Sequence, residues 1–451
     1  MSMSRYKKLQ LINAPLSSLF KPSIRAGAYP PYHLVSLASY LHEHSLNLEI
    51  ELLDGEFHDT EDLVGLIDAD IVGISTNTVT YDQALIIAKA AKAKGAKVVI
   101  GGPHATFVGG LILTNQNDVD YVVKGEGEKP LLELIGGTPP NKIPRCWYRE
   151  DREVKFSFEE PISMDACLLN YRYIDLDSYF SRFKRIYPEK PFQRAFVTFS
   201  AKGCGWRDKT NGGCIFCAIF NGSFQSKSPS NYWKEVEYYH DTYGADFFWD
   251  VSDTFTMQKD WLLELAEKSP CLDHVGFHVY ARASDIDEQT RDALLKIGAY
   301  EVFIGIESGD DNLLKSAKKG TTTKINKRAI KILADSGIHL SLSVILGLPG
   351  ESRESLEKTI DHFSELTEIA KVEEIHVSLL MPLPGSRAFQ MMLDHPLLRP
   401  RYTDRDLFNW ETGRRDWVTH FCNIDYEEML QFQTRMLKFA RRAGSFGLSN
   451  E

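Results

Sequence analysis

Three cysteines lie close together along the chain and could hold a metal centre. Cys204, Cys214 and Cys217 follow an apolar run at Ala195–Ser200. A 4Fe-4S cluster has four irons and normally takes four thiolates, so three cysteines leave one iron open to another ligand. An open coordination position is typical of catalytic rather than structural metal sites. The sequence therefore predicts that these three thiolates bind a 4Fe-4S cluster with one reactive iron.

A zinc site is the alternative interpretation of the same cysteines. His240 is the nearest downstream residue that could serve as a fourth ligand. The usual spacing of zinc motifs would place that histidine closer, which favours the cluster. A zinc-stabilised binding protein without catalysis nevertheless stays open as a different class of function.

Composition and charge exclude several partners. The seven cysteines are an odd number, mostly scattered, and no secretory leader stands at the N-terminus, so we expect a reducing cytoplasmic location and no disulfide framework. The formal net charge of −10 argues against a nucleic acid or an anionic membrane surface as the main partner. The basic run Lys315–Lys319 reads as a solvated helix end. No apolar run approaches the roughly 18–20 residues that a membrane span needs.

The chain of 451 residues predicts about three domains, and residues 1–136 form the first. Apolar strands alternate with amphipathic helices there, which is typical of a doubly wound, Rossmann-like α/β domain with a parallel sheet. Strands are expected at Leu9–Asn13, Leu48–Asp54, Asp70–Thr76, Lys97–Gly101 and Asp120–Val123, and helices at His33–His44, Thr60–Ile67, Tyr81–Lys94 and Lys129–Ile135.

The loops that follow these strands are small and polar. In open α/β sheets, ligands bind beyond the carboxyl ends of the strands. Glycines in such loops let the backbone approach a ligand, and Ser or Thr hydroxyls can bond to it. The Gly-x-Gly-x-x-Gly pattern of a dinucleotide site is absent after the first strand. We therefore expect a ligand other than a dinucleotide at this edge.

Residues 195–385 repeat the alternation of strands and helices. Six strand-helix units predict a partial (β/α)6 barrel that is open on one side, with chemistry at the carboxyl ends of its strands. The cysteine loop follows the first strand. Strands are expected at Ala195–Ser200, Asp246–Val251, Val275–Ala281, Glu301–Ile306, Leu340–Leu346 and Glu374–Leu380, and helices at Pro229–Tyr243, Lys259–Glu267, Glu288–Lys296, Lys324–Ser336 and Arg353–Thr367.

Two further segments complete the expected organisation. Residues 137–194 predict a connector with a short hairpin, Cys146–Tyr148 against Glu153–Phe156. Residues 386–451 predict a small helical C-terminal cap in which a loop bears Trp410 and Trp417. The helices expected in the cap are Arg387–His395, Thr403–Phe408 and Tyr426–Phe446.

The segment 195–385 resembles the radical SAM superfamily. The cysteine loop, Gly305–Gly309 after the fourth strand and Leu346–Glu351 after the fifth stand in the expected order. The usual cysteine spacing is Cys-x3-Cys-x2-Cys, whereas here nine residues separate the first two cysteines. A longer loop costs little closure entropy, so all three cysteines remain the expected ligands.

The resemblance also implies a site for S-adenosylmethionine (SAM). Each position follows from a matching place in the superfamily pattern. Arg282 and Glu307 could instead form an ordinary ion pair at the barrel mouth. The implied contacts are Phe216 near the adenine, Asp253 at the amino group, Arg282 at the carboxylate, Glu307 at the ribose hydroxyls, and Leu346 with Gly347 beside the adenine.

Four strand-end loops of the first domain are Asn13–Pro15, Ser75–Thr78, Gly101–Thr106 and Gly125–Glu128. With these loops the domain resembles the cobalamin-binding domain that precedes many radical SAM enzymes. It lacks the Asp-x-His-x-x-Gly motif, so the resemblance implies a cobalamin whose lower face meets no such histidine. A histidine in a Gly-Pro loop more often satisfies backbone hydrogen bonds than ligates a metal. A domain without any cofactor is the alternative. The implied cobalamin residues are Ser75, Thr76, Gly101, Gly102, His104, Gly125, Glu126 and Gly127.

Together these resemblances imply an enzyme, with the catalytic side chain itself unassigned. Reductive cleavage of SAM would give a 5'-deoxyadenosyl radical that removes hydrogen from an unactivated carbon, and the cofactors would supply the difficult chemistry. Methyl transfer from methylcobalamin to a natural product or peptide is the expected outcome. Ring formation, rearrangement or another non-methyl transfer is the alternative. A small-molecule or peptide substrate and a flavodoxin or ferredoxin reductant are the expected partners.

Overall fold

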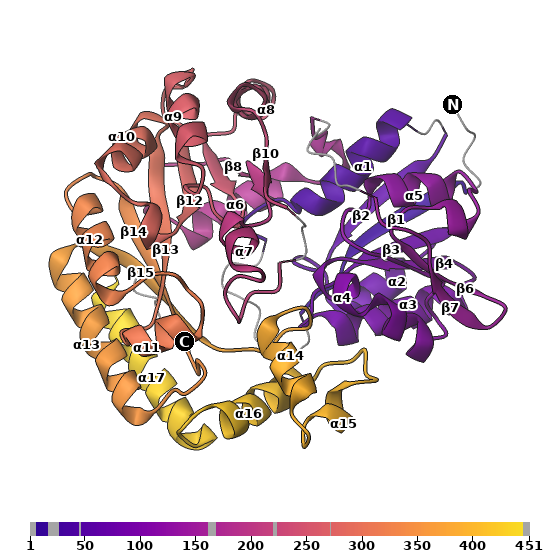
Figure 1. The fold of residues 1–451 in the computed structure, drawn as a ribbon. Coiled ribbons are helices and arrows are strands. Elements are labelled where there is room, and N and C mark those ends of the chain that lie inside the picture. Colours follow the sequence, from indigo (N-terminus) through magenta and orange to yellow (C-terminus); the bar gives the residue numbers. More distant parts are fainter. Residues whose placement is uncertain are drawn as a thin grey trace. The chain divides into compact units, whose positions relative to one another are not determined.

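The structure is a computed structural model that describes residues 6–16, 27–44, 47–160, 168–219, 223–270 and 272–444. Contacts divide the chain into two compact units (Figure 1). The first unit is Met1–Val197 with Arg399–Phe408, and the second is Thr198–Leu398 with Asn409–Glu451. We call the segment Arg399–Phe408 the strap. The domain boundaries 136, 194 and 385 stay predictions, and Cys167 and Cys271 lie outside the described residues.

The first unit is built on a seven-stranded sheet in the order β2-β1-β3-β4-β5-β6-β7. The strands β1 to β5 pair in parallel, and β6 and β7 add an antiparallel hairpin at one edge. This hairpin lies in the predicted connector. The strands are β1 (Lys8–Asn13), β2 (Glu49–Asp54), β3 (Ile71–Ser75), β4 (Lys97–Gly101), β5 (Tyr121–Val123), β6 (Cys146–Glu150) and β7 (Glu153–Phe156).

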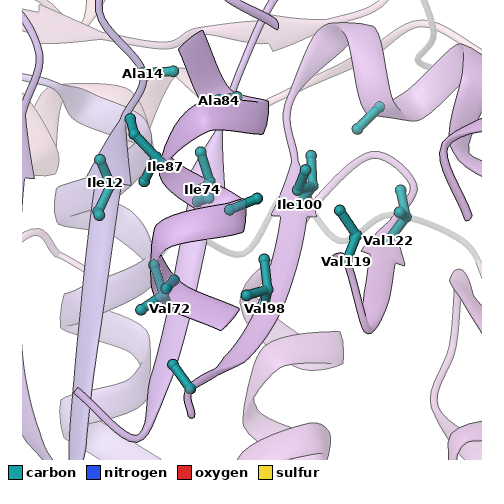
Figure 2. Packing of buried hydrophobic residues seen from close by; sticks show 14 of the residues in the cluster. Ile12, Ala14, Val72, Ile74, Ala84, Ile87, Val98, Ile100, Val119 and Val122 are labelled. Carbon is teal, nitrogen blue, oxygen red and sulfur yellow. The ribbon is translucent and has the colours of Figure 1, made fainter. Parts of the chain in front are cut away.

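Helices cover both faces of this sheet, as the doubly wound prediction requires. Successive strand residues face opposite sides, so Leu11 packs into one core and Ile12 into the other. Figure 2 shows Ile12 and Ile74 of the sheet packed near Ile87 of helix α3. The helices are α1 (Tyr32–His44), α2 (Thr60–Leu66), α3 (Tyr81–Ala93), α4 (Pro103–Asn115), α5 (Glu128–Ile135), α6 (Leu176–Ile186), the strap helix α15 (Arg399–Tyr402), and the 3-10 turns η1 (Pro140–Lys142) and η2 (Tyr171–Tyr173).

Helix α4 was not predicted, because its sequence begins as a glycine-proline turn. Pro103 takes the first helical position, where its missing N–H is not needed. Two glycines inside the helix receive the indole of Trp147 from β6. A Cβ on Gly109 would stand 2.6 Å from the Trp147 ring, and one on Gly110 would stand 3.1 Å from it. The missing side chains therefore let the hairpin pack against the helix.

The second large sheet has six strands in the order β15-β14-β13-β12-β11-β8, and its edge strand β8 spans the boundary between the two units. The order is linear, so within the described residues this sheet stays open, as the partial barrel predicts. Its pairs from β11 to β15 are parallel. The strands are β8 (Ala195–Thr198), β11 (Phe247–Asp250), β12 (Gly276–Ala281), β13 (Ala299–Glu307), β14 (His339–Leu346) and β15 (Val372–Leu379), with a separate pair β9 (Ala201–Lys202) and β10 (Gln225–Ser226).

Capping residues define the helices of the second unit. Ser228 accepts a hydrogen bond from the Asn231 N–H at the start of α8, and Gly244 ends that helix in the left-handed conformation. None of the described helices is both long and apolar enough to cross a bilayer. The helices are α7 (Gly205–Thr210), α8 (Pro229–Tyr243), α9 (Lys259–Glu267), α10 (Glu288–Lys296), α11 (Asp311–Ser316), α12 (Thr323–Leu333), α13 (Arg353–Ile369), α14 (Arg387–Asp394), α16 (Trp410–Phe421), α17 (Tyr426–Ala443) and the turn η3 (Ala283–Asp285).

Two expectations for the C-terminal cap were wrong. Residues 403–408 were expected to be helical, but the structure has no helix there. This segment is held instead by hydrogen bonds that the Asp406 carboxylate accepts from other parts of the first unit. The loop expected around Trp410 and Trp417 is helix α16, which Asn409 caps at its start. Helices α14 and α17 lie where the sequence placed them.

Candidate active site

The cysteine loop follows β8 and β9 in the second unit, and its long first gap contains a helix. Cys204 stands immediately before helix α7, which fills most of the gap to Cys214. Gly212 and Gly213 then turn the chain back with φ angles of +127° and +69°. Positive φ angles of this kind favour glycine, so the Gly-Gly pair before Cys214 has a structural reason. The unusual cysteine spacing is therefore a folded feature.

The three thiols are free and lie within electrostatic reach of one another. Burial raises the pKa of Cys217 to about 12, and Asp253 and the thiols of Cys214 and Cys204 add to that shift. Burial also raises the pKa of Cys214, while Lys319 and Arg282 oppose the shift. Cations beside a thiol favour the thiolate that binds a metal.

The cysteine side chains are not already arranged around one point. Across the described ranges, no three His, Cys, Asp or Glu side chains stand in the geometry of a metal site. The donor chemistry nevertheless fits a cluster, because three free thiols share one loop and two cations lie near Cys214. These residues would hold the iron, and closure of the loop around it would be part of binding.

A buried ion pair lies at the carboxyl end of β13. Glu307 Oε1 is 2.7 Å from Lys319 Nζ, and the Ser343 hydroxyl donates to Glu307 Oε2 over 2.9 Å. Glu307 has a φ of +67°, and the register of β13 against β14 shifts at this point. A Cβ on Gly305 would stand 2.4 Å from the Glu307 carboxylate and 2.5 Å from the Lys319 ammonium. Gly305 therefore leaves the room that this ion pair occupies.

Lys319 was not predicted as a site residue, and its basic run is not uniformly solvated. Lys319 is only 8% exposed, whereas Lys315 and Lys318 of the same run are exposed. Its ammonium lies 5.9 Å from the centre of the Phe216 ring. No local pattern indicates that Lys319 is buried, because the fold brings Lys319 to Glu307 through tertiary contacts.

Arg282 follows β12 and does not pair with Glu307. One of its terminal nitrogens donates to the Lys319 carbonyl, and its guanidinium lies 4.8 Å from the centre of the Trp206 ring. Its positive charge also opposes the burial that raises the pKa of the Cys214 thiol. The alternative of an Arg282–Glu307 ion pair is therefore wrong. Arg282 instead links the cysteine loop to the segment that follows β13.

Trp206 fixes helix α7 against that same segment. Its indole N–H donates to the Lys318 carbonyl over 2.8 Å. Gly320 has a φ of +72°, and a Cβ there would stand 2.2 Å from the Trp206 ring. The Ile215 N–H also donates to the Ala317 carbonyl over 3.1 Å. These contacts hold the cysteine loop beside Arg282 and Lys319.

The predicted SAM positions Asp253, Leu346 and Gly347 lie at or just beyond the carboxyl ends of β11 and β14. The pKa of Asp253 is raised to about 6, mainly because the surrounding protein removes water, although the Gly203 N–H and Arg207 oppose the shift. Leu346 is buried at the end of β14. Gly347 donates its N–H to Glu351 over 3.2 Å, and its carbonyl accepts from Trp417 Nε1 over 2.7 Å. The loop after β14 is thus held from both sides.

The predicted cobalamin loops meet at one edge of the first sheet. The Thr76 N–H donates to the Gly101 carbonyl over 3.1 Å, which joins the loops after β3 and β4. The Gly125 N–H donates to the Thr106 hydroxyl over 3.0 Å, and that hydroxyl donates to the Gly102 carbonyl over 2.9 Å. These bonds bring together the loops that contain Ser75, Thr76, Gly101, Gly102, Gly125, Glu126 and Gly127.

Gly102 is required by the close approach of two of these loops. Its φ is +95°, and a Cβ there would stand 2.5 Å from the Thr76 carbonyl oxygen. A Cβ on Gly101, in contrast, would meet nothing within 4 Å. Gly101 therefore leaves open space at the edge where a ligand is expected.

His104 is a buried, neutral residue of helix α4. Its Nδ1 lies 3.1 Å from the Thr78 hydroxyl and its Nε2 lies 2.8 Å from the Asp406 carbonyl oxygen. Burial lowers the pKa of His104 to about 4. With both ring nitrogens engaged, His104 presents no free nitrogen to a metal, in keeping with the interpretation of a histidine that satisfies hydrogen bonds.

The sequence did not predict that the strap packs against α3 and α4, beside the loops expected to bind cobalamin. Asp406 Oδ2 accepts from the Tyr81 hydroxyl over 2.6 Å and from Gln116 Nε2 over 2.8 Å, and Oδ1 accepts from Asn115 Nδ2 over 2.9 Å. Asp406 follows Tyr81 by more than three hundred residues, and no sequence period links them. An aspartate in a short polar stretch does not by itself predict such a contact.

The two sites together define the class of protein: a doubly wound ligand domain joined to an open barrel with a three-thiol loop. Residues 203–363 match the radical SAM superfamily, and residues 25–135 match the B12 binding domain. The chain therefore contains a radical SAM domain and a B12-binding domain, which confirms the predicted fold class and the predicted resemblance to cobalamin-binding radical SAM enzymes. These domains imply a 4Fe-4S cluster and SAM in one unit and cobalamin in the other.

Known relatives and structures agree with this class. The chain is 27% identical over 410 residues to an uncharacterised methyltransferase of Pyrococcus horikoshii, covering 87% of this chain and 84% of that protein. It is 26% identical to the anaerobic magnesium-protoporphyrin IX monomethyl ester cyclase of Rubrivivax gelatinosus, and the match covers 84% of this chain and 72% of that protein. The methyltransferase TsrM of Kitasatospora setae, solved with cobalamin and a 4Fe-4S cluster, has the same fold, with a TM-score of 0.64. The two sequences are 19% identical, and the match covers 86% of this chain and 75% of that chain.

Proposed function

We propose that this enzyme uses SAM and cobalamin to transfer a methyl group to an unactivated carbon of a small molecule or peptide. The observation that carries the proposal is the placement of the cysteine loop beside Arg282, Lys319 and Glu307. Chemistry in barrels gathers at the carboxyl ends of the strands, which is where these side chains lie.

The residues divide the work of binding between them. Cys204, Cys214 and Cys217 would hold the cluster. Arg282 would bind a carboxylate of SAM, because its planar guanidinium suits that geometry. Glu307, fixed by Lys319 and Ser343, would accept hydrogen bonds from the ribose hydroxyls.

Three remaining positions would complete the SAM site. Phe216 and the loop at Leu346–Gly347 would border the adenine, and Asp253 would meet the amino group. When bound, the cluster supplies the electron that cleaves SAM, and cobalamin supplies the methyl group. The chain's own part is to orient these groups and keep water away from them.

The cobalamin edge would use its loops in two ways. Ser75, Thr76, Gly101, Gly102, Gly125, Glu126 and Gly127 would line the corrinoid. His104 would position the loop after β4 through its bonds to Thr78 and Asp406. We expect no histidine beneath the cobalt.

Methyl transfer is favoured over other outcomes because two of the similar proteins reported above are named methyltransferases. The cyclase similarity keeps ring formation as the second candidate. A reduced flavodoxin or ferredoxin in the cytoplasm would be the electron donor. No nucleic acid or membrane is part of the proposal.

Anaerobic iron and sulfide reconstitution tests the cluster. We expect about four irons per chain with charge-transfer absorbance. Cys214→Ala should lose that absorbance, whereas Cys146→Ala, which alters a buried free cysteine of the first unit, should keep it. One zinc per chain and no iron would contradict the proposal and support the zinc-stabilised scaffold.

The transfer itself is tested with SAM, cobalamin and a reductant in the absence of air. Formation of 5'-deoxyadenosine together with S-adenosylhomocysteine would support methyl transfer. Formation of 5'-deoxyadenosine alone, with cobalamin bound and candidate substrates present, would favour the ring-forming alternative.

A further inference from the structure

A buried arginine stands beside the cobalamin loops with most of its hydrogen-bonding groups unused. Arg145 is 4% exposed, and its Nε and Nη1 have no hydrogen-bond partner. Its Nη2 donates a hydrogen bond to the Glu126 carbonyl over 3.3 Å. A buried charge without partners is costly, so such a group points to a missing ligand.

The position of Arg145 is the edge at which ligands of α/β sheets bind. Cys146 pairs antiparallel with Val123, so the start of β6 lies beside the carboxyl end of β5. The Arg145 carbonyl accepts from the Lys124 N–H over 2.9 Å, and its own N–H donates to the Phe158 carbonyl over 2.8 Å. Arg145 also has a φ of +52°. The surrounding backbone therefore holds it in a strained conformation.

Nearby carboxylates do not account for this arginine. Glu159 pairs with Lys124, and Glu160 pairs with Lys129 at 2.5 Å. Arg149, four residues along, shows what a structural arginine looks like here. Its guanidinium donates to the carbonyls of Leu113, Val119 and Gln116, including 2.6 Å to Val119. Arg145 has no comparable set of acceptors.

We infer that Arg145 is a cobalamin-binding residue that holds the phosphate of the cofactor's nucleotide tail. The phosphodiester is the anionic side group of cobalamin, and a guanidinium binds phosphate oxygens through paired N–H donors. Glu126 belongs to the loop joined through Gly125 and Thr106 to Gly102, so Arg145 touches the same set of loops. This inference rests on the proposed cobalamin function.

The test compares corrinoid binding by the wild-type chain, Arg145→Met and Arg145→Lys, using absorbance titration. The probes are hydroxocobalamin, which has the phosphate, and dicyanocobinamide, which lacks the nucleotide tail. We expect Arg145→Met to weaken hydroxocobalamin binding between about tenfold and about a hundredfold. Cobinamide affinity should stay within about twofold, and Arg145→Lys should retain part of the hydroxocobalamin affinity.

Stability of the cofactor-free chain separates this role from a structural one. Arg145→Met should leave the thermal midpoint unchanged or higher, because it removes a buried unpaired charge. Arg149→Met, the matched control, should lower the midpoint because three carbonyls lose their donors.

Several outcomes would overturn the inference. One is equal affinity of Arg145→Met and wild type for hydroxocobalamin, and another is an equal loss for both corrinoids. A lower midpoint of the cofactor-free Arg145→Met chain would show a structural arginine. If the wild-type chain binds neither corrinoid, the cobalamin part of the proposed function fails as well, which distinguishes that failure from an error about Arg145 alone.

Discussion

At the scale of single residues, the Glu307–Lys319 pair sets the electrostatics of the barrel mouth. Both side chains are at most 10% exposed, so each depends on the other for compensation of its charge. Removing one member of a buried pair leaves an uncompensated charge, which typically costs about 3–5 kcal/mol.

We expect Lys319→Met to lower the free energy of unfolding of the cofactor-free chain by about 3 kcal/mol, and to abolish SAM binding. Urea unfolding and equilibrium dialysis measure these two effects. The double variant Lys319→Met/Glu307→Gln should recover most of the stability without recovering SAM binding. A single variant as stable as the wild type would show that the pair is solvated.

His104 predicts a dependence of stability on pH. Its pKa is about 4 in the folded chain, against an ordinary value of 6.5. Below pH 6.5 His104 is protonated in the unfolded chain but stays neutral in the folded chain. The free energy of unfolding therefore decreases as the pH falls from 6.5 toward 4. The full contribution is about 3 kcal/mol.

His104→Gln should remove this part of the pH dependence, because the amide does not titrate. Urea unfolding of both chains between pH 7 and pH 4.5 gives the comparison. We expect the stability difference between wild type and variant to shrink as the pH falls. An unchanged difference over that range would mean that His104 does not stay neutral in the folded chain.

At the scale of elements, the strap belongs to the unit that is remote from it in sequence. Asp406 gathers Tyr81 from α3 and Asn115 of α4, together with Gln116 just beyond that helix. We expect Asp406→Ala to cost about 2–4 kcal/mol, because three donors lose their acceptor inside the protein.

Asp404→Ala is the matched control for the strap. It removes the same side chain from an exposed position two residues earlier, so we expect a change below about 0.5 kcal/mol. Hydrogen exchange at α3 and α4 should rise only in the Asp406 variant. Equal effects of the two variants would argue against a specific role for the Asp406 carboxylate.

Helices α7 and α4 show why the sequence alone did not predict every element of the fold. The cysteine spacing was readable, but α7 is short and its position depends on Trp206 and Gly320, which lie far apart in the chain. Helix α4 opens on glycine and proline, which predict a turn. Local pattern fails at such places because distant contacts decide the conformation.

At the scale of the whole molecule, the two units predict two separate responses to ligands. Cobalamin should slow hydrogen exchange in residues 75–78, 101–106 and 124–127. SAM with the reconstituted cluster should slow it around Arg282, Glu307 and Gly347. A ligand protects the amides that it orders, so exchange followed by mass spectrometry reports each site. Cobalamin binding without protection of its three loops would contradict the predicted site.

The sequence by itself determined the chemistry and the order of the elements. Cysteine spacing, strand-end glycines and alternating apolar segments are local patterns, so they can be recognised without knowledge of distant contacts. They were enough to predict the cluster ligands, the doubly wound domain and the open barrel.

Only the tertiary structure decided which side chains complete each site. It buried Lys319 against Glu307, engaged both nitrogens of His104, brought the strap to α3 and α4, and left Nε and Nη1 of Arg145 without acceptors. The physical reason is that burial and pairing depend on neighbours far away in the chain. Residue type and spacing alone do not specify those neighbours.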